Sequence, residues 1–335
     1  MRIAVDAMGG DYGPRVTIQG AIEAAREYNL EVLLVGVEDV LKKEFQGLVQ
    51  SESRVTIIDA PEAIGMGEGL LSFRRKRHSS IRIGAQLVKE GRAEALVSVG
   101  NTSAVVYLSR KVLGRMKGID RPALALLLPT PAGLSLLIDV GANANCKPQH
   151  LVQFAVMGGI FMENILGRTN PRVGLMSIGE EETKGNDLTK AAFDKLQDTP
   201  LNFIGNLEGK DLFSGKADIV VSDGFTGNVA LKVSEGVVEH LFSLAKREVM
   251  GNFLAKIGFL LLRRNLRRMY KKFDYAEVGG AQLLGLDGVC IIGHGRSDSR
   301  AVMNAVRRAR DFVAGRVQDR IRDELARAGG GVKIG

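Results

Sequence analysis

The chain has 335 residues, of which 45% are hydrophobic and 25% are charged, and its net charge is +8. This length allows one large α/β unit or two modest domains, and the glycines cluster after strand-like runs, which excludes a low-complexity chain. The two cysteines, Cys146 and Cys290, provide neither a disulfide framework nor a metal-binding spacing, which favours a reducing cytoplasm. The N-terminal "MRIAVD" is typical of a strand rather than a signal peptide, and no apolar run approaches the roughly 20 residues that span a bilayer.

Short apolar runs that end in Gly, Asp or Asn alternate along the chain with helical patterns. The expected strands are residues 2–6, 31–36, 55–59, 95–98, 123–128, 135–140, 172–178, 202–205 and 219–222. The expected helices are residues 17–27, 81–89, 104–115, 150–165, 186–196 and 229–250. Continuous apolar strands between helices predict a mainly parallel sheet that is covered on both faces. We therefore expect one three-layer α/β/α unit over residues 1–335, with ligands at the carboxyl ends of strands.

Four polar, glycine-rich corners each follow an expected strand. We name them corner one (residues 6–11), corner two (100–103), corner three (179–186) and corner four (223–228). Each can present free backbone N–H groups near a helix start, where the helix dipole favours an anion such as phosphate. We expect the four corners to lie on the same edge of the sheet. Ordinary helix capping by Asn, Thr, Asp and Gly is the alternative for each corner.

The candidate residues follow from these corners and from the polar loop "GHGRSDS" at residues 293–299. The candidates for contact with phosphate or with a substrate bound beside it are Asp6, Gly9, Gly10, Asn101, Thr102, Gly224, Thr226 and Gly227. The candidates for catalysis are Lys184, Asn186, Asp223, Asn228 and His294. We expect Asp223 to orient Lys184 or another donor. His294 is either an acid/base or phosphate donor or a structural loop histidine, and Cys146 lacks the basic partner that a reactive thiol needs.

Two further observations concern which ligand the corners could bind and whether two of them are related. No corner has the G-x-G-x-x-G fingerprint of dinucleotide sites or the G-x-x-x-x-G-K-[ST] phosphate loop. Residues 97–102 and 221–228 share the order of strand, Ser, Gly, Thr or Asn, and helix. This similarity indicates either an internal duplication or only the same turn chemistry.

Two basic segments contribute to the net charge. The first contains Arg74, Arg75, Lys76 and Arg77, and is either a solvated helix entry or a site that captures phosphate or an acidic partner. The second, residues 249–273, has seven cations and no acid. A helix there would gather apolar side chains on one face beside cations, which suits the surface of an anionic bilayer. These side chains are Phe253, Leu254, Ile257 and Leu261.

Residues 249–273 are also compatible with two roles that do not involve a membrane. The first is an ordinary core helix with a charged tail. The second is nucleic-acid binding, but no aromatic interleaving or known binding module supports it, and we expect no nucleic-acid partner.

The motifs together resemble the bacterial phosphate acyltransferases, the PlsX family. The resemblance is carried, in order along almost the whole chain, by "VDAMGGD", "RK" followed by "SS", "SVGNT", "KGIDRPA", "DVGAN", "KGN", "DGFTGN" and "GGA". Two positions depart from the family pattern. Arg296 stands where a small residue is expected, and "EGLLS" at residues 68–72 stands where Pro and Val are expected.

The resemblance implies transfer of a fatty acyl group from acyl carrier protein to inorganic phosphate, giving acyl phosphate for phospholipid synthesis. It implies a fold similar to the isocitrate/isopropylmalate dehydrogenase and phosphotransacetylase group. It also implies a cytosolic, peripherally membrane-bound homodimer. An acyl-phosphate glycerol-3-phosphate acyltransferase would act downstream, and we expect neither a cofactor nor a metal.

The chemistry of this reaction needs little machinery. Phosphate is already anionic, and a thiol with a pKa of roughly 8.5 is a good leaving group, so we expect positioning and oxyanion stabilisation rather than a covalent enzyme intermediate. The alternatives are a phosphotransacetylase that uses acyl-CoA, a nicotinamide-dependent dehydrogenase of related fold, and a non-enzymatic, membrane-associated scaffold.

Overall fold

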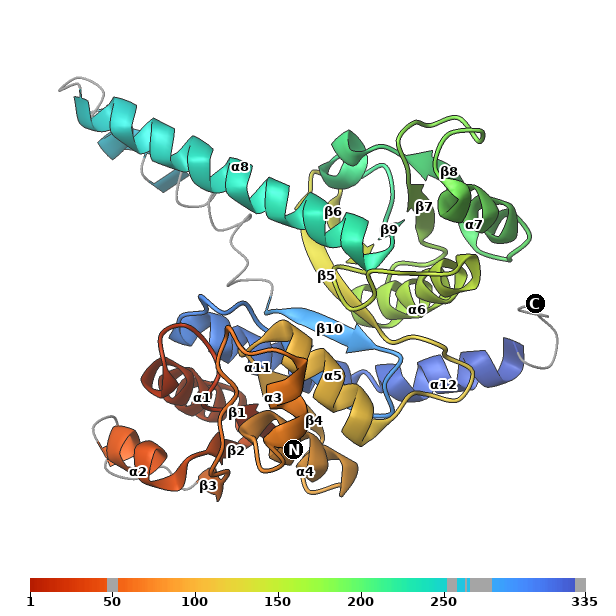
Figure 1. The fold of residues 1–335 in the computed structure, drawn as a ribbon. Helices are drawn as coiled ribbons and strands as arrows, with labels where there is room; N and C mark the ends of the chain where they lie inside the picture. The colour runs from red at the N-terminus through yellow and green to blue at the C-terminus, as the bar shows by residue number, and fades with distance from the viewer. Residues whose placement is uncertain (47–53, 252–257, 263, 266–278, 329–335) are drawn as a thin grey trace.

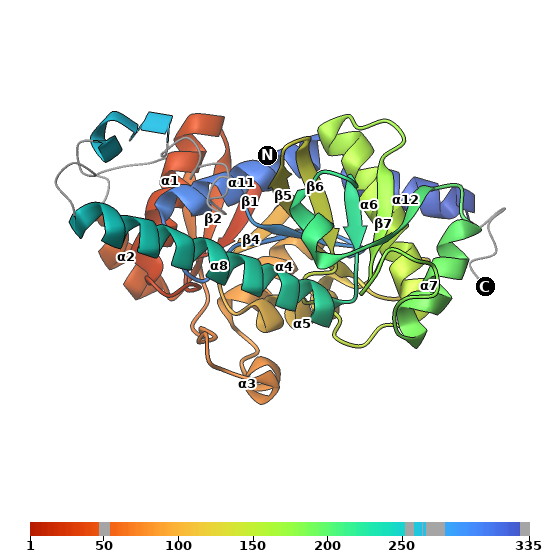
Figure 2. The same cartoon turned by 90° about the horizontal axis from the view of Figure 1, so that it is seen from above.

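The computed structural model describes residues 1–46, 54–251, 258–262, 264–265 and 279–328. Within these residues one mixed sheet of eleven strands runs through the molecule in the order β3-β2-β1-β4-β11-β10-β5-β6-β9-β7-β8. Helices cover both faces of the sheet, and the long helix α8 projects away from the body (Figures 1 and 2). This arrangement confirms the predicted three-layer α/β/α fold with a mainly parallel sheet.

The elements have the following bounds. The strands are β1 Arg2–Asp6, β2 Glu31–Gly36, β3 Val55–Asp59, β4 Ala95–Ser98, β5 Ala123–Thr130, β6 Gly133–Ile138, β7 Arg172–Met176, β8 Asn202–Leu207, β9 Ile219–Val221, β10 Ala281–Leu284 and β11 Val289–Ile292. The helices are α1 Pro14–Tyr28, α2 Glu38–Gln46, α3 Leu70–Arg75, α4 Ser80–Lys89, α5 Thr102–Leu113, α6 Pro148–Leu166, α7 Asp187–Gln197, η1 Gly209–Phe213, α8 Gly224–Gly251, α11 Ser299–Ala314 and α12 Val317–Ala328.

The core has two apolar layers, one on each face of the sheet. Alternate residues of each strand point to opposite faces, so a single strand contributes to both layers. One layer joins the sheet to α1, α6, α11 and α12, and includes the fully buried Phe154, Phe161 and Phe312. The other layer joins the sheet to α4 and α5 through residues such as Ile81 and Leu108. Burial on both faces explains why the strands are continuously apolar.

The chain reverses direction in the middle of the sheet. Strands β3, β2, β1, β4 and β11 are mutually parallel, and β6, β9, β7 and β8 form a second parallel set. Between these sets, β10 is antiparallel to both β11 and β5, and β5 is antiparallel to β6. The two parallel sets therefore run in opposite directions, and β10 and β5 lie between them. Strands β10 and β11 come from the last part of the chain.

This reversal corrects the expectation that the four corners share one edge of the sheet. Corners one and two follow β1 and β4, whereas corners three and four follow β7 and β9, which run the opposite way. The strand order also differs between the sets when the strands are counted along the chain. In the first set the fourth strand, β4, lies at the end of the series β3-β2-β1-β4, next to the first strand, β1. In the second set the fourth strand, β9, lies between the second strand, β7, and the first strand, β6. The sequence similarity between residues 97–102 and 221–228 is thus not accompanied by a matching strand order. This favours shared turn chemistry over a simple duplication.

Most predicted elements are present, but the last part of the chain was missed. Strands β1 to β4 have the predicted bounds, and β5 to β9 differ by a few residues at their ends. After residue 250 the sequence predicted only the basic helix and a helix that follows the loop at residues 293–299, which corresponds to α11. The elements β10, β11 and α12 were overlooked, as were α2 and α3. The two missed strands, β10 and β11, have four residues each and come from the last part of the chain.

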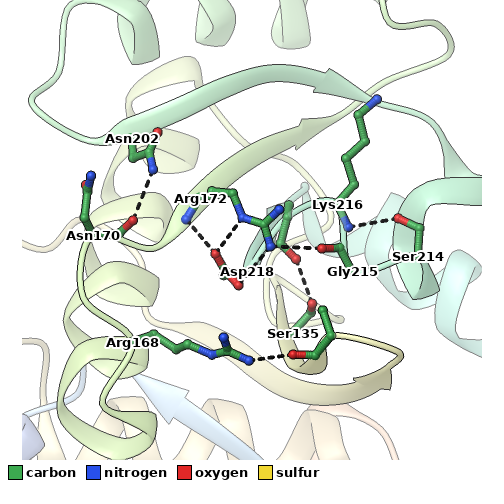
Figure 3. A network of polar contacts seen from close by, with 11 residues as sticks. Ser135, Arg168, Asn170, Arg172, Asn202, Ser214, Gly215, Lys216 and Asp218 are labelled. Atoms are coloured by element: carbon green, nitrogen blue, oxygen red, sulfur yellow. Dashed lines mark hydrogen bonds and ion pairs between the residues drawn. The ribbon is translucent and has the colours of Figure 1, made fainter.

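A polar network fastens the start of β7 to the start of β9 (Figure 3). The Arg172 guanidinium donates to Asp218 Oδ2 at 3.0 Å and to Gly215 O at 2.9 Å, and the Arg172 backbone N–H donates to the same carboxylate at 2.9 Å. Nearby, Ser135 Oγ donates to Ala217 O at 2.7 Å. Burial raises the pKa of Asp218, but hydrogen bonds from Arg172 outweigh burial and leave this pKa below its ordinary value of 3.8.

The depressed pKa predicts a pH-dependent contribution to stability. The ionised Asp218 stabilises the fold above about pH 4, and this contribution is lost as the pH falls through the folded-state pKa. We expect Asp218→Asn to lower the free energy of unfolding by about 1–2 kcal/mol at pH 7, since Arg172 is partly exposed, and by less at pH 3. Urea unfolding at the two pH values measures the difference. An equal loss at both pH values would contradict the prediction.

Candidate functional site

A buried carboxylate joins corner one to corner two. Asp6, at the end of β1, accepts hydrogen bonds from Ser98 Oγ at 2.6 Å and from the Met8 N–H at 3.2 Å. Ser98 Oγ in turn accepts the Gly100 N–H at 3.1 Å. Burial raises the pKa of Asp6, while hydrogen bonds from Ser80 and Ser98 act in the opposite direction. The carboxylate thus sets the shape of both loops, and its predicted role in ligand contact stays a prediction.

Close backbone approach explains the glycines of corner one. A Cβ on Gly9 would lie 2.6 Å from the Gly100 backbone nitrogen, and Gly10 has a φ of +96°, which disfavours other residues. The Asp11 N–H donates to Gly295 O at 2.7 Å. Corners one and two and the loop at residues 293–298 therefore form one surface, which we call the loop cluster.

The loop cluster contains the start of helix α5, where two backbone N–H groups lack a hydrogen-bond partner among the described residues. Helix α5 begins at Thr102, and Asn101 Oδ1 accepts the Ala104 N–H. The backbone N–H groups of Thr102 and Ser103 have no hydrogen-bond partner within the described part of the chain, and both residues are exposed. These N–H groups lie at the positive end of the helix dipole, so this position suits an anion.

Asn101 itself is not available to a ligand. Its amide group donates to Met66 O at 2.8 Å and to Glu68 O at 3.0 Å, which uses both amide hydrogens. Lys76 closes the same segment, through an ion pair with Glu68 at 2.6 Å and a hydrogen bond to Ala63 O. Asn101 is thus an anchor for residues 62–76, and Lys76 is structural rather than a free cation.

Corner four is filled by its own carboxylate. Asp223 accepts the N–H groups of Phe225 and Thr226 at 3.0 and 2.9 Å, and the Thr226 hydroxyl at 2.7 Å. The Gly224 N–H donates to Asn143 O, and the Gly227 N–H to Asp223 O. The alternative of ordinary capping is therefore correct for Asp223, which does not contact Lys184 in the described structure. The backbone N–H groups of Gly224, Phe225, Thr226 and Gly227 are therefore all used within the protein.

A second buried carboxylate, which is not among the predicted site residues, lies under corner four. Asp139 accepts five hydrogen bonds, from Leu124 N, Gly141 N, Ala142 N, Asn143 N and Asn143 Nδ2, at 2.7–3.1 Å. Burial raises its pKa. A Cβ on Gly227 would lie only 2.0 Å from Asp139 O, so α8 can approach this loop only with glycine there. The available signal was the "DVGAN" motif, which places an aspartate and a glycine after a strand as in corner one.

Corner three is separate from the other corners. Asn186 caps α7 by accepting the Thr189 N–H at 2.9 Å, and Lys184 is exposed next to Glu181 and Glu182, which are also exposed. Among the described residues no hydrogen bond or ion pair joins corner three to another corner. The roles of Lys184 and Asn186 in phosphate contact remain predictions, and the adjacent carboxylates oppose binding of an anion.

Helix α8 brings the other half of the sheet to the loop cluster. Lys232 Nζ lies 3.3 Å from His294 Nε2, and Arg296 forms an ion pair with Glu239 at 2.8 Å. Lys232 is eight residues after the start of α8 at Gly224, or about 12 Å along the helix. His294 therefore contacts the helix that begins at corner four, and its loop is bonded to corner one. Arg296, which departs from the family pattern, binds α8 as well. Asn228 is exposed on the first turns of α8.

The two cysteines lack the character of nucleophiles. Burial, followed by the charge of Asp139, raises the pKa of Cys146 to about 11, and burial raises the pKa of Cys290 to about 12. Neither thiol is ionised at neutral pH, which agrees with the interpretation of Cys146 as non-catalytic.

The basic segments are only partly described. Arg74 donates to the Tyr107 hydroxyl at 3.3 Å, and Arg75 and Arg77 are exposed. Phe253, Leu254 and Ile257 lie outside the described residues, whereas Leu261 is 79% exposed. None of the described helices combines the length and apolar character needed to cross a membrane.

Comparison with known proteins places the chain in a family. Its fold is similar to that of a phosphotransacetylase from Streptococcus pyogenes, with a TM-score of 0.63 at 17% identity over 95% of this chain and 94% of that one. A family model described as "Fatty acid synthesis protein" matches residues 1–320. A phosphate acyltransferase of Pelotomaculum thermopropionicum is 50% identical over 97% of this chain and 95% of its own. Another, of Heliobacterium modesticaldum, is 51% identical over 93% and 94%. The chain therefore belongs to the phosphate acyltransferase family.

The buried Asp139 should be essential for the stability of the part of the molecule that contains β6, β9, β7 and β8, which we call the second half. In Asp139→Asn one acceptor oxygen becomes an NH₂ group that faces backbone N–H donors, so we expect the free energy of unfolding to fall by about 2–4 kcal/mol. The exposed Asp198→Asn makes the same chemical change at the end of α7 and should alter stability by about 0.5 kcal/mol or less. Chemical denaturation of both variants measures this, and similar losses would show that the Asp139 hydrogen bonds are not required.

Proposed function

We propose that the protein transfers a long-chain fatty acyl group from acyl carrier protein to inorganic phosphate and releases acyl phosphate for phospholipid synthesis. Membership of the phosphate acyltransferase family supports the acyl transfer to phosphate. The structural observation that carries the proposal is the start of α5, where the Thr102 and Ser103 N–H groups have no partner in the described residues. These groups belong to the loop cluster, in which Gly9 packs against Gly100, and they suit phosphate or a developing oxyanion.

The proposed reaction is a direct displacement. An oxygen of monohydrogen phosphate attacks the thioester carbonyl carbon, a C–O bond forms and the C–S bond breaks. The phosphate proton passes to the departing sulfur, so the products are acyl phosphate and the free thiol of the carrier. Backbone N–H groups would stabilise the carbonyl oxygen as it gains charge. The raised pKa of Cys146, about 11, argues against a covalent acyl-thioester on this residue.

The surface around α3 supports an acidic carrier as the acyl donor. Arg75, at the end of α3, and Arg77, just after it, are exposed, and Leu70 and Leu71 at the start of α3 are 46% and 70% exposed. Asn101 ties this segment to corner two, so a partner docked there would lie near the loop cluster. Cations beside exposed apolar side chains favour an acidic protein partner through steering and apolar contact.

The first experiment measures acyl phosphate, trapped as its hydroxamate, with palmitoyl-acyl carrier protein as donor. We expect product only when inorganic phosphate is present, and less product with palmitoyl-CoA or acetyl-CoA. Preference for acetyl-CoA would identify a phosphotransacetylase instead. No product with any donor would overturn the proposal and leave the dehydrogenase, tested by NADH titration, and the scaffold.

Exposed apolar residues on α8 support the proposed homodimer. Val229, Val233, Val237 and Leu241 recur every four residues and are 46–60% exposed. Residues at this spacing form a stripe along one face of a helix, which in a projecting helix suits packing against a second copy (Figure 1). The downstream glycerol-3-phosphate acyltransferase partner remains a prediction.

We further propose that the tip beyond α8 attaches the enzyme to anionic membranes. Phe259, Leu260, Leu261 and Leu262 are 43–79% exposed and precede the exposed Arg264. Apolar side chains beside a cation suit the interface of an anionic bilayer.

Vesicle flotation tests the membrane proposal. Leu260→Glu/Leu261→Glu should abolish co-flotation of the protein with vesicles that contain anionic phospholipid, because carboxylates replace apolar side chains and repel the surface. The control is Ile178→Glu, which alters a residue of the second half that is 81% exposed and should float as the wild type does. Unchanged flotation of the double variant would reject this segment as the attachment site.

A further inference from the structure

Three guanidinium groups gather near the end of α5. Arg110 lies in the last turn of this helix, and Arg115 and Arg121 lie in the loop that joins α5 to β5. Arg121 belongs to the "KGIDRPA" motif, to which the proposed function gives no role. Burial lowers the pKa of Arg110, and the charges of Arg121 and Arg115 lower it further. Both of these groups therefore lie close enough to repel Arg110.

These charges have no ion-pair partner in the described part of the chain. The side chains of Arg110 and Arg121 form no hydrogen bond or ion pair there, and the Arg115 side chain donates only to the backbone oxygen of Asp120, at 2.7 Å. Arg121 is half-buried, whereas Arg110 is exposed. Cations gathered in this way repel one another unless an anion neutralises them. An anionic ligand would therefore complete this cluster.

Hydrogen bonds hold the backbone on both sides of Arg121. The Asp120 N–H donates to Gln153 Oε1 on α6 at 3.0 Å, and Asn143 Nδ2 donates to Pro122 O at 2.7 Å. Asp120 and Pro122 flank Arg121 in the sequence. The residue that carries the guanidinium is thus fixed against α6 and against the loop that follows β6.

His150 adds a hydrogen-bond donor beside this loop. It lies one turn before Gln153 on α6, and hence on the same side of the helix. Its Nδ1 accepts the Lys147 N–H at 3.1 Å, so the neutral ring carries its proton on Nε2. This Nε2–H has no hydrogen-bond partner in the described structure, although the residue is only 5% exposed. The Nε2 atom is not fully enclosed, so an acceptor from solution can reach it.

The charges that act on His150 are mostly positive. Burial lowers its pKa, and the charge of Arg121 is the largest further contribution in that direction, so the ring is neutral at pH 7. Lys147 acts in the same direction, and Asp120 acts against them. Arg121 therefore lies close to the His150 ring as well as to Arg110.

The cluster is separate from the anion position at the start of α5. Arg110 comes eight residues after Thr102, which is about 12 Å along the helix. The cluster instead adjoins corner four, because Asn143, which bonds Pro122, also accepts the Gly224 N–H at 2.8 Å. A ligand held by the cluster would lie near the end of α5 and near corner four.

We propose that Arg110, Arg121 and the Nε2–H of His150 bind a phosphoryl group between the end of α5 and the start of α6. The planar guanidinium fork matches two phosphoryl oxygens, and the imidazole N–H donates to one of them. The inference rests on the proposed function, which involves two groups of this chemistry. One is inorganic phosphate, and the other is the phosphodiester that joins the prosthetic arm to an acyl carrier protein.

The test uses the full-length protein and calorimetric titration with inorganic phosphate, with phosphopantetheine and with pantetheine, which lacks the phosphoryl group. We expect the wild type to bind at least one phosphoryl probe. Arg121→Gln should weaken that binding about tenfold or more, since a charge-assisted hydrogen bond is lost. Arg121→Lys should weaken it less, because the charge remains while the fork is lost. Arg110→Gln, at an exposed position, should weaken the same probe.

Two controls separate binding from folding. Arg92→Gln removes an exposed guanidinium just beyond α4 and should change none of these affinities. Arg121→Gln should not lower the midpoint of thermal unfolding in the absence of ligand, because it removes a repulsion from Arg110. A lower midpoint with unchanged affinity for both phosphoryl probes would identify Arg121 as a structural residue and overturn the inference.

Kinetics identify which phosphoryl group occupies the site. If it is inorganic phosphate, Arg121→Gln should raise the KM for phosphate about tenfold and leave the KM for the acyl donor unchanged. If it is the phosphodiester of the arm, the variant should raise the KM for palmitoyl-phosphopantetheine and not that for palmitoyl-pantetheine. Either result supports the inference.

The possible failures are distinguishable. A wild-type enzyme that makes no acyl phosphate would overturn the proposed function, and the titrations would still report on the site. A wild type that binds neither phosphoryl probe, or an active enzyme whose Arg121→Gln variant binds both probes normally, would overturn the inference alone.

Discussion

Buried carboxylates that collect the N–H groups of glycine-rich loops are the interaction on which the site depends. Asp6 and Asp139 each end a parallel strand and lie beside the corner that follows a neighbouring strand. Desolvation makes such a charge costly unless several donors surround it, so each loop folds around its carboxylate. Glycines are required because the two loops approach too closely for side chains, as Gly9 and Gly227 show. The same device thus forms a loop platform in each half.

The two platforms differ in what they offer a ligand. At corner four Asp223 occupies the start of α8, so the positive end of this helix is already neutralised. At corner two the cap is the uncharged Asn101, and the next N–H groups remain without a partner in the described chain. A carboxylate cap competes with phosphate, whereas an amide cap does not. This difference directs attention to the first half as the place where an anion would bind.

Helix α8 then connects the second half of the molecule to the loop cluster in the first half. It begins over Asp139 and reaches the loop at residues 293–298, where its ion pairs and the Lys232 contact lie. Strand direction separates corners two and four at the level of the sheet, and the helix spans part of that separation. A long helix suits this task because each residue adds a fixed rise, so that a side chain eight positions along has a defined place.

The sequence by itself determined the fold class, strands β1 to β4 and the existence of the glycine-rich corners, because these depend on local apolar patterning and turn chemistry. It could not determine which corners face each other, since this depends on the β5–β6 reversal and on strands β10 and β11 from the far end of the chain. It equally could not distinguish a capping amide from a ligand contact at Asn101, or associate Lys232 with His294. Those pairings join residues 33 to 62 positions apart, and only tertiary packing selects among such distant partners.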